Sequence, residues 1–338
     1  MAMNTMRALV FDRFGEPSDV LKLREVPVPR PGPGQVRVRM IASPINPSDL
    51  LLIRGVYGRP AGPPAVPGFE GVGVVEESGG GFLAWRVLGK RVAVLNGQGG
   101  NWQEQVVIPA RQAIPVPDDL PEEQVASFFV NPATALVIVT RVLRVPRGEW
   151  LLQTAANSSL GKMIIRLGHT LGFRTINVVR RPEAREELAE LKPDKILVWQ
   201  EGYDLAQLLR QHIPEGTVRY AVDAVGGPLG SQIISCLGPD GRLVVYGTLS
   251  DQPLLFSPRE LMVNNRRVEG FWLAEWVKRQ GPLTMLRLFR QIVRGLRQGV
   301  LTTKVAAQYP IERYHDALAH AETPGRSGKI LLRFTRIP

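Results

Sequence analysis

The sequence has few of the side chains that build disulfides and metal centres. Among 338 residues there is one cysteine, Cys236, and there are four histidines: His169, His212, His315 and His320. A single cysteine excludes an intrachain disulfide and a structural zinc site built on four thiolates. We interpret Cys236 as an inert thiol buried in an apolar helix. The histidines are too scattered to form a ligand set, so we predict no metal site.

Long apolar runs and low-complexity tracts are also missing. No stretch reaches membrane-spanning length without a charge, and the opening segment MAMNTMRALVFDRFG has no continuous apolar run after its basic residue. Hydrophobic residues make up 44% of the chain and charged residues 22%, which is ordinary for a globular protein. We therefore expect a cytoplasmic protein without a membrane partner, long enough for two domains.

Acidic residues are in short supply. The 42 Lys and Arg residues exceed the 31 Asp and Glu residues, which gives a formal net charge of +11. That surplus would suit a nucleic-acid-binding protein, but the basic residues are spread along the chain, and there is no RNP-type motif or aromatic-rich platform. We predict no nucleic-acid partner, because an acidic substrate or partner explains the charge equally well.

The two parts of the chain differ in composition and in hydrophobic pattern. Residues 1–121 are rich in glycine and proline, with short apolar or alternating runs such as GQVRVRMIA and KRVAVLNG, which predict a small β-barrel with long loops. From residue 122 buried strands alternate with helices, which predicts a doubly wound parallel sheet and an α/β fold. The strands are expected at 149–155, 174–179, 194–199, 218–225, 241–247 and 266–272, and the helices at 158–172, 183–191, 203–212 and 228–237.

After this sheet the sequence predicts one long helix over about 283–298 and a last strand over 328–334. The nucleotide domain is complete without them, so we expect this tail to return to the first domain. The predicted domains are therefore a catalytic domain of residues 1–121 and 273–338 and a nucleotide-binding domain of residues 122–272.

The turn AANSSLG, residues 155–161, stands where dinucleotide-binding folds carry a glycine-rich loop. Of the three glycines usual there, only the one that lets the helix pack close to its strand is present, as Gly161. Small residues replace the others. Serine and asparagine are good N-cap residues, and a helix N-terminus attracts anions. The turn alone is equally compatible with a plain helix cap.

The next predicted strand ends in Arg180 and Arg181. An acidic residue at this place would bind the ribose 2′-hydroxyl of NAD, whereas guanidinium groups match a 2′-phosphate. The sequence therefore favours NADPH. The alternative is that both arginines are solvated surface residues.

Several motifs occur in order along nearly the whole chain: INPSDLLLIRGVYG, VPGFEGVGVV, GNWQEQVV, VNPATA, QTAANSSLGKMII, TINVVRR, DAVGG, YGTLS and GFWLAEW. Together they resemble the medium-chain dehydrogenase/reductase superfamily, in the zinc-independent branch that contains the 2-enoyl thioester reductases. The resemblance implies a Rossmann domain and a GroES-like β-barrel catalytic domain. Zinc-dependent members bind metal through a cysteine and the histidine of a GHE motif. This chain has Ala42 and Ser43 in the first region and Phe69 in the second, so neither ligand is present.

Tyr57, in RGVYG, matches the family's catalytic tyrosine. A phenol is protonated at neutral pH and can donate a proton, although the sequence leaves open whether Tyr57 does so or positions the substrate. By resemblance, Ser159 replaces a common glycine, and the two phosphate-binding arginines are adjacent where relatives often separate them. The resemblance implies that the cofactor is bound by Asn131, Asn157, Ser158, Ser159, Leu160, Arg180, Arg181, Tyr246, Gly247, Thr248, Leu249, Phe271, Trp272, Leu273, Ala274 and Lys329.

The activity implied by this resemblance is NADPH-dependent reduction of the C=C bond of 2-enoyl thioesters on CoA or an acyl carrier protein. Two alternatives stay open. One is a zinc-free NADPH:quinone oxidoreductase or enone reductase, and the more distant one is a non-catalytic NADPH- or RNA-binding protein. The resemblance also implies a homodimer that pairs through the sheet edge near residues 262–272.

Overall fold

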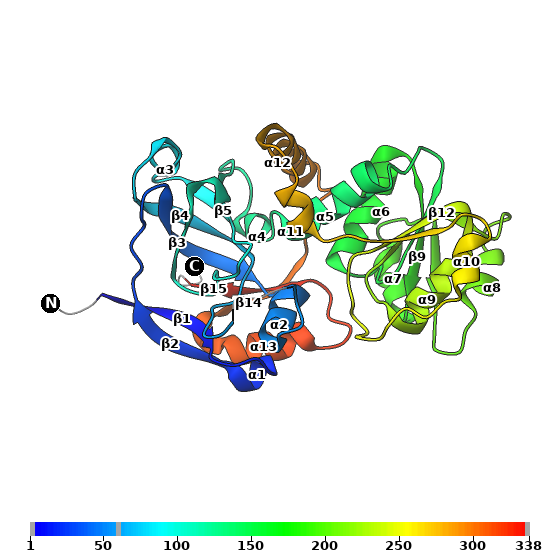
Figure 1. Ribbon diagram of the computed structural model, residues 1–338, viewed down its shortest axis with the longest axis horizontal. Helices are drawn as coiled ribbons and strands as arrows, with labels where there is room; N and C mark the ends of the chain where they lie inside the picture. The colour runs from blue at the N-terminus through cyan, green and yellow to red at the C-terminus, as the bar shows by residue number, and fades with distance from the viewer. Residues whose placement is uncertain (1–3, 59–61, 335–338) are drawn as a thin grey trace. The chain divides into compact units, whose positions relative to one another are not determined.

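The computed structural model describes residues 4–58 and 62–334. The chain divides into two compact units, one of residues 1–130 with 302–338 and one of residues 131–301, coloured along the chain in Figure 1. Each unit is described by itself.

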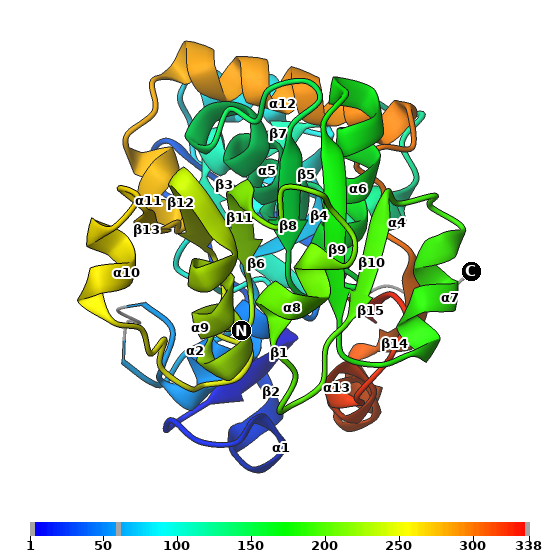
Figure 2. The same cartoon turned by 90° about the vertical axis from the view of Figure 1, so that its right-hand side faces the viewer.

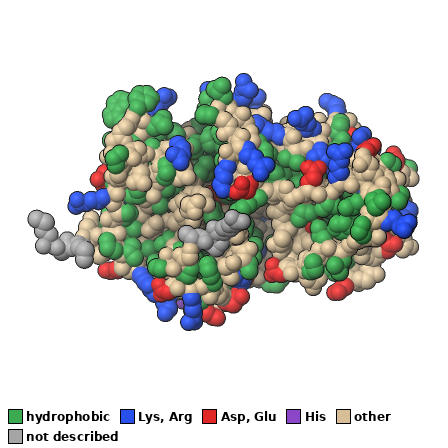
Figure 3. All heavy atoms as spheres, in the orientation of Figure 1, with side chains coloured by type: hydrophobic (Ala, Val, Ile, Leu, Met, Phe, Trp, Pro, Cys, Tyr) green, Lys and Arg blue, Asp and Glu red, His purple; other side chains and the backbone are tan. Residues whose placement is uncertain are grey.

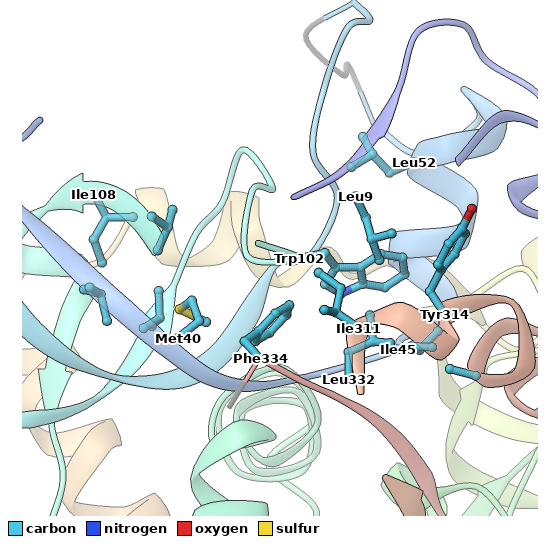
Figure 4. Close-up of a cluster of buried hydrophobic side chains, with 14 of the residues drawn as sticks. Leu9, Met40, Ile45, Leu52, Trp102, Ile108, Ile311, Tyr314, Leu332 and Phe334 are labelled. Carbon is cyan, nitrogen blue, oxygen red and sulfur yellow. The ribbon is translucent and has the colours of Figure 1, made fainter. Parts of the chain in front are cut away.

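The first unit is built on a seven-stranded sheet. Side chains of its long central strand alternate, so that Val36, Val38 and Met40 are fully buried. The core beneath the sheet surrounds Trp102 and includes Phe334 from the end of the chain (Figure 4). The strand order is β14 (Val305–Pro310), β15 (Lys329–Arg333), β3 (Gln35–Pro44), β4 (Glu70–Ser78), β5 (Arg91–Leu95) and β7 (Ala113–Pro115), with β6 (Gln105–Pro109) paired to β3.

A two-stranded antiparallel sheet and short helices complete this unit. The C-terminal strands β14 and β15 pair with each other and β15 pairs with β3, so the last part of the chain does return to the first domain. The remaining elements are β1 (Thr5–Phe11), β2 (Leu21–Pro27), α1 (Pro17–Val20), α2 (Pro47–Arg54), α3 (Phe82–Val87), α4 (Glu122–Ala126) and α13 (Tyr314–Glu322).

The second unit is a six-stranded sheet in which every pair is parallel (Figure 2). The chain starts at β8 in the middle, winds outward in one direction, and then winds from β11 in the other. The predicted doubly wound α/β fold is confirmed. The order is β10 (Lys195–Val198), β9 (Arg174–Val179), β8 (Trp150–Gln153), β11 (Val218–Asp223), β12 (Leu237–Val245) and β13 (Arg267–Gly270).

Helices connect these strands close to their expected positions. The largest difference among the strands is β12, which begins at Leu237, several residues before the predicted start. The helices of this unit are α5 (Val130–Val137), which starts at the unit boundary, α6 (Ser159–Leu171), α7 (Glu183–Ala189), α8 (Leu205–Arg210), α9 (Gly227–Cys236), α10 (Pro258–Met262), α11 (Leu273–Lys278) and α12 (Pro282–Arg297).

Both boundaries between the compact units come later in the sequence than expected. The first follows residue 130 instead of residue 121, and the second follows residue 301 instead of residue 272. Residues 273–301, expected in the first domain, belong to the second unit. Hydrogen bonds explain the assignment: Arg141 donates to Gln291 of α12 at 3.2 Å, and Arg166 of α6 donates to the carbonyl of Val300 at 3.2 Å. Helix α4, expected in the nucleotide domain, packs instead on β3 and β4.

Candidate active site

The turn between β8 and α6 is closed without most of the usual glycines. Ala155 has a φ of 47°, in the left-handed region that favours glycine. Ser158 caps α6, and its hydroxyl oxygen accepts the backbone N–H of Gly161 at 3.0 Å. A Cβ at Gly161 would lie 2.5 Å from the carbonyl oxygen of Ala156, so the helix approaches the turn this closely only because residue 161 has no side chain.

The side chain of Asn157 is hydrogen-bonded to Glu187, which the sequence did not point to as a site residue. Its Nδ2 donates to Oε2 of Glu187 at 3.1 Å, and Nζ of Lys162 lies 3.7 Å from the same oxygen. The signal for Glu187 was the acidic face of the helix that follows Arg180 and Arg181, since that helix packs beside the turn. The Oδ1 atom of Asn157 is buried and has no partner among the described residues.

Arg180 and Arg181 follow β9 directly, at the carboxyl end of the strand. The Arg180 side chain is exposed, and Arg181 is half-buried. The carboxyl end of a parallel sheet is the edge at which nucleotides bind in doubly wound folds. The two arginines therefore lie at the edge that the sequence predicted for them.

The ends of β8 and β11 are tied together where the winding of the sheet changes direction. The Thr154 hydroxyl donates to the buried Asp223 carboxylate, which also accepts the backbone N–H groups of Val225 at 2.9 Å and Gly226 at 2.8 Å. The DAVGG motif thus acts through Asp223, which was not among the predicted site residues. Its carboxylate fixes the loop after β11 at this edge of the sheet.

The remaining predicted cofactor segments come to the same edge. Tyr246, which begins the segment to Leu249, donates its backbone N–H to the carbonyl of Asp223 at 2.8 Å, and Phe271 donates to the carbonyl of Val245 at 2.8 Å. The Tyr246 hydroxyl is buried with no partner among the described residues, and burial raises the pKa of this phenol above its usual value. Trp272 is 38% exposed, and residues 273 and 274 begin α11.

Asn131 and Lys329 complete the predicted cofactor residues. Asn131 is half-buried in the first turn of α5, and among the described residues no hydrogen bond joins its side chain to this edge. Lys329 belongs to the first unit, at the start of β15. There it lies with buried polar groups that the sequence reasoning did not predict.

Lys329 is buried against Asn46, Glu70 and Asp49. Its Nζ donates to Oδ1 of Asn46 at 2.5 Å, and Nδ2 of Asn46 donates to Oε1 of Glu70 at 3.1 Å. Burial lowers the pKa of Lys329 to about 8 and raises the pKa of Glu70. Glu70 also accepts the backbone N–H groups of residues 129 and 130. The NPSD sequence, a helix-capping pattern, was the one signal for part of this cluster.

Tyr57 lies three residues beyond the end of α2 and is half-buried. Its ring centroid is 5.4 Å from that of Phe69, with the ring planes at 51°. Both rings pack against the core of the first unit. The residue at the position of the GHE histidine is thus an aromatic ring in contact with the tyrosine that matches the family's catalytic residue.

The described residues contain no cluster of three His, Cys, Asp or Glu side chains placed to hold a metal ion. Ser43, in the region of the missing cysteine, donates its hydroxyl to the carbonyl of Glu70 at 2.6 Å. Cys236 is fully buried in α9, as expected, and burial raises its pKa to about 12.

Comparisons with known proteins agree with this architecture. Residues 32–118 match the family described as alcohol dehydrogenase GroES-like domain, and residues 159–290 match zinc-binding dehydrogenase. The mitochondrial enoyl-[acyl-carrier-protein] reductase of Mus musculus is 32% identical over 332 residues, covering 97% of this chain and 88% of the relative.

Solved structures give the same result. A putative NADPH:quinone reductase from Bacillus thuringiensis has a TM-score of 0.91 and 30% identity, over 98% of this chain and 100% of that one. A complex of Etr1p with NADP and crotonyl-CoA has a TM-score of 0.83 and 26% identity, with the same coverage of 98% and 100%.

The expected cytoplasmic location is wrong. The matched reductases of Mus musculus, Xenopus tropicalis and Homo sapiens are all named as mitochondrial. A scarcity of cysteine and of long apolar runs does not distinguish one aqueous compartment from another. In the part of the chain that the structure describes, no helix is long and apolar enough to cross a membrane. Because a relative that is 32% identical matches 97% of this chain and 88% of its own length, this chain belongs to the medium-chain dehydrogenase/reductase superfamily, in its enoyl thioester reductase branch.

Proposed function

We propose that this protein reduces the C=C bond of 2-enoyl thioesters, carried on CoA or an acyl carrier protein, with NADPH as the reductant. The observation that carries the proposal is the contact between Tyr57 and Phe69. It puts a phenol, which can donate a proton, beside a ring at the position where zinc-dependent members carry a metal ligand. Reduction of an activated C=C bond needs a proton donor and no Lewis acid. The enoyl thioester reductase relatives support the same reaction.

The residues at the carboxyl edge of the parallel sheet fit NADPH. Asn157 and Tyr246 each keep a buried polar atom without a partner among the described residues, which a polar ligand would satisfy. The N-terminus of α6, capped by Ser158, offers free N–H groups to a phosphate. Arg180 and Arg181 provide charge for a 2′-phosphate. The proposed cofactor residues are Asn131, Asn157–Leu160, Arg180, Arg181, Tyr246–Leu249, Phe271–Ala274 and Lys329.

The reaction adds a hydride and a proton across the double bond. Bound NADPH supplies the hydride, which goes to the β-carbon, and the conjugated thioester carbonyl takes up the resulting negative charge. Tyr57 then serves the α-carbon, either by giving the proton through its hydroxyl or by holding the substrate for protonation by water. Tyr57 is half-buried, and its ring packs against that of Phe69.

Replacing Tyr57 with phenylalanine tests this role. Tyr57→Phe should lower kcat with crotonyl-CoA about 100-fold, the size of a typical proton-transfer contribution. It should leave the Kd for NADPH, measured by fluorescence titration, unchanged. The matched control is Tyr203→Phe, at a phenol that is 47% exposed on the other unit. Full activity of Tyr57→Phe would remove Tyr57 from the mechanism.

A quinone reductase is the second candidate, and the structure from Bacillus thuringiensis supports it. The two activities separate when NADPH oxidation is followed in parallel with crotonyl-CoA, with a simple quinone and with no substrate. The proposed function requires the largest kcat/KM with crotonyl-CoA. A larger value with the quinone would favour the second candidate.

We also propose that the reaction needs no zinc. Ala42 and Phe69 cannot ligate a metal, and Ser43 is bonded to a backbone carbonyl. Prolonged EDTA treatment should leave activity and Tm unchanged, and elemental analysis should find no stoichiometric zinc. Loss of activity that added zinc restores would contradict this.

A homodimer is proposed from the edge of the parallel sheet. Strand β13 is the last in the sheet, and two exposed apolar residues at the end of α10 precede it in the sequence: Met262 is 80% exposed and Val263 is 57% exposed. An unpaired strand edge with exposed apolar side chains nearby in the sequence favours pairing with another copy. Light scattering should therefore give a dimer at micromolar concentration. Met262→Glu with Val263→Glu should shift it toward monomer, and a wild-type monomer would argue against the proposal.

A further inference from the structure

The buried Asp49 carboxylate joins two segments that are distant in sequence. Its Oδ2 accepts the backbone N–H of Asn46 at 2.7 Å, which fixes the first turn of α2. Its Oδ1 accepts the backbone N–H of Phe69 at 3.1 Å, at the entry to β4. Asp49 is fully buried, so water does not compete for these bonds. One carboxylate therefore holds the start of α2 and the backbone of Phe69 in a fixed relation.

Tyr57 depends on both of these segments. Gly55 caps the C-terminus of helix α2 with a φ of 78°, and a Cβ there would lie 2.7 Å from the ring of Phe14. The chain therefore leaves α2 in a direction that only glycine permits comfortably. Beyond this turn, the Tyr57 ring packs on the Phe69 ring. The backbone of Phe69 is held a second time, because its carbonyl accepts the N–H of Asn96 at 2.8 Å.

We propose that Phe69 is a positioning residue for Tyr57, with Asp49 fixing the backbone of Phe69. The inference rests on the proposed role of Tyr57 in serving the α-carbon. A second ring packed against the phenol ring restricts its rotation, so the hydroxyl occupies fewer positions and is oriented before substrate binds. Phe69 stands at the position where zinc-dependent members carry a metal ligand. In this chain that position instead packs against Tyr57, the proposed proton donor.

A double-mutant cycle in kcat tests the proposal. Phe69→Leu removes the ring but keeps an apolar side chain, and it should lower kcat with crotonyl-CoA about tenfold or more, as misplacement of a reacting group does. The Kd for NADPH should not change. In a Tyr57→Phe background the same substitution should have no further effect, because Phe69 acts through the phenol. Phe69→Tyr, which keeps the ring, should retain most of the activity.

Asp49→Asn is the second variant in case Phe69→Leu folds poorly. It keeps both rings and weakens the anchor of Phe69, so its effect on kcat should also vanish in the Tyr57→Phe background. Tyr309→Leu is the matched control: Tyr309 is another half-buried aromatic residue on the same core, and its loss should lower Tm without changing kcat.

The outcomes separate the inference from the proposed function. If Tyr57→Phe slows the reaction but Phe69→Leu and Asp49→Asn lower kcat equally in both backgrounds, or not at all, positioning is overturned while the role of Tyr57 stands. If Tyr57→Phe keeps full activity, the role of Tyr57 fails and the inference fails with it.

Discussion

The backbone N–H of Gly161 donates to the hydroxyl oxygen of Ser158 at 3.0 Å, across the turn that joins β8 to α6. A serine cap thus does part of the work that glycines do in other dinucleotide turns. It satisfies one free N–H of the first helical turn and leaves its neighbours for a phosphate. The glycine that remains is the one for which no other residue has room.

Gly161→Ala should therefore damage the turn more than its size suggests. The new Cβ would lie 2.5 Å from the carbonyl oxygen of Ala156, so α6 must move away from the turn. We expect a Tm lower by several degrees and a weaker Kd for NADPH, measured by thermal melting and fluorescence titration. Gly281→Ala, where a Cβ would meet nothing within 4 Å, should change neither. Wild-type binding by Gly161→Ala would show that the close approach is unimportant.

The two arginines after β9 should set the choice of cofactor. Each charge-assisted contact to a 2′-phosphate contributes about 1.5–3 kcal/mol, so the wild-type protein should prefer NADPH to NADH by an order of magnitude or more in kcat/KM. Arg180→Ala with Arg181→Ala should reduce that ratio mainly by weakening NADPH, with little change for NADH. Equal use of both cofactors by the wild-type protein would mean that these arginines are solvated surface residues that do not bind the 2′-phosphate.

The parallel sheet, and the position of Arg180 and Arg181 at its carboxyl edge, could be predicted because both are encoded locally. Apolar β-branched runs predict buried strands, and the residues that follow each run collect at one edge of the sheet. The domain boundary was harder to predict from the sequence, because the apolar face of an amphipathic helix such as α12 does not specify which core the helix covers. The cluster around Lys329 was hidden for another reason: its bond to Asn46 spans 283 residues, and no pattern in a single sequence reports such a contact.

The buried Asp49 should leave a signature in the dependence of stability on pH. Burial and the charge of Glu70 raise its pKa to about 7, against the effects of Lys329 and two backbone N–H groups. The folded protein then holds this proton at pH values where the unfolded chain, with an ordinary carboxyl pKa of about 4, has lost it. The stabilisation of the folded state by protonated Asp49 is therefore fully present below about pH 4 and is lost as the pH rises through about 7.

Asp49→Asn removes the titrating group, so its Tm should fall less between pH 5 and pH 7.5 than the Tm of the wild-type protein. Lys329 and Glu70 remain in both proteins, which makes the difference in slope the informative quantity. Asp118→Asn, at an exposed carboxylate of the same unit, should keep the wild-type slope. An unchanged slope in Asp49→Asn would mean that Asp49 is ionised throughout this range.

The arginines of α12 form a separate basic surface. Leu288, Ile292 and Leu296 are buried, whereas Arg290 and Arg294 are exposed on the opposite side with Arg287. These three arginines form no ion pair with any described residue, although Lys278 pairs with Glu275 at 2.6 Å. Figure 3 shows Lys and Arg side chains on the visible face of the region that carries α12. A solvated helix face would look the same, so the function of this surface needs a kinetic test.

If these arginines meet an acidic carrier, either the phosphates of CoA or an acyl carrier protein, they act mainly on encounter. Such contacts are screened over about 8 Å at physiological salt, so they should change kcat/KM and leave kcat alone. Arg290→Glu with Arg294→Glu should raise KM for a carried thioester at low ionic strength and spare a small uncharged enone. Arg30→Glu with Arg111→Glu makes the same change in charge at exposed sites of the other unit and should have little effect. A KM that stays unchanged across a salt series, for both CoA- and carrier-linked substrates, would show that the α12 arginines are only solvated.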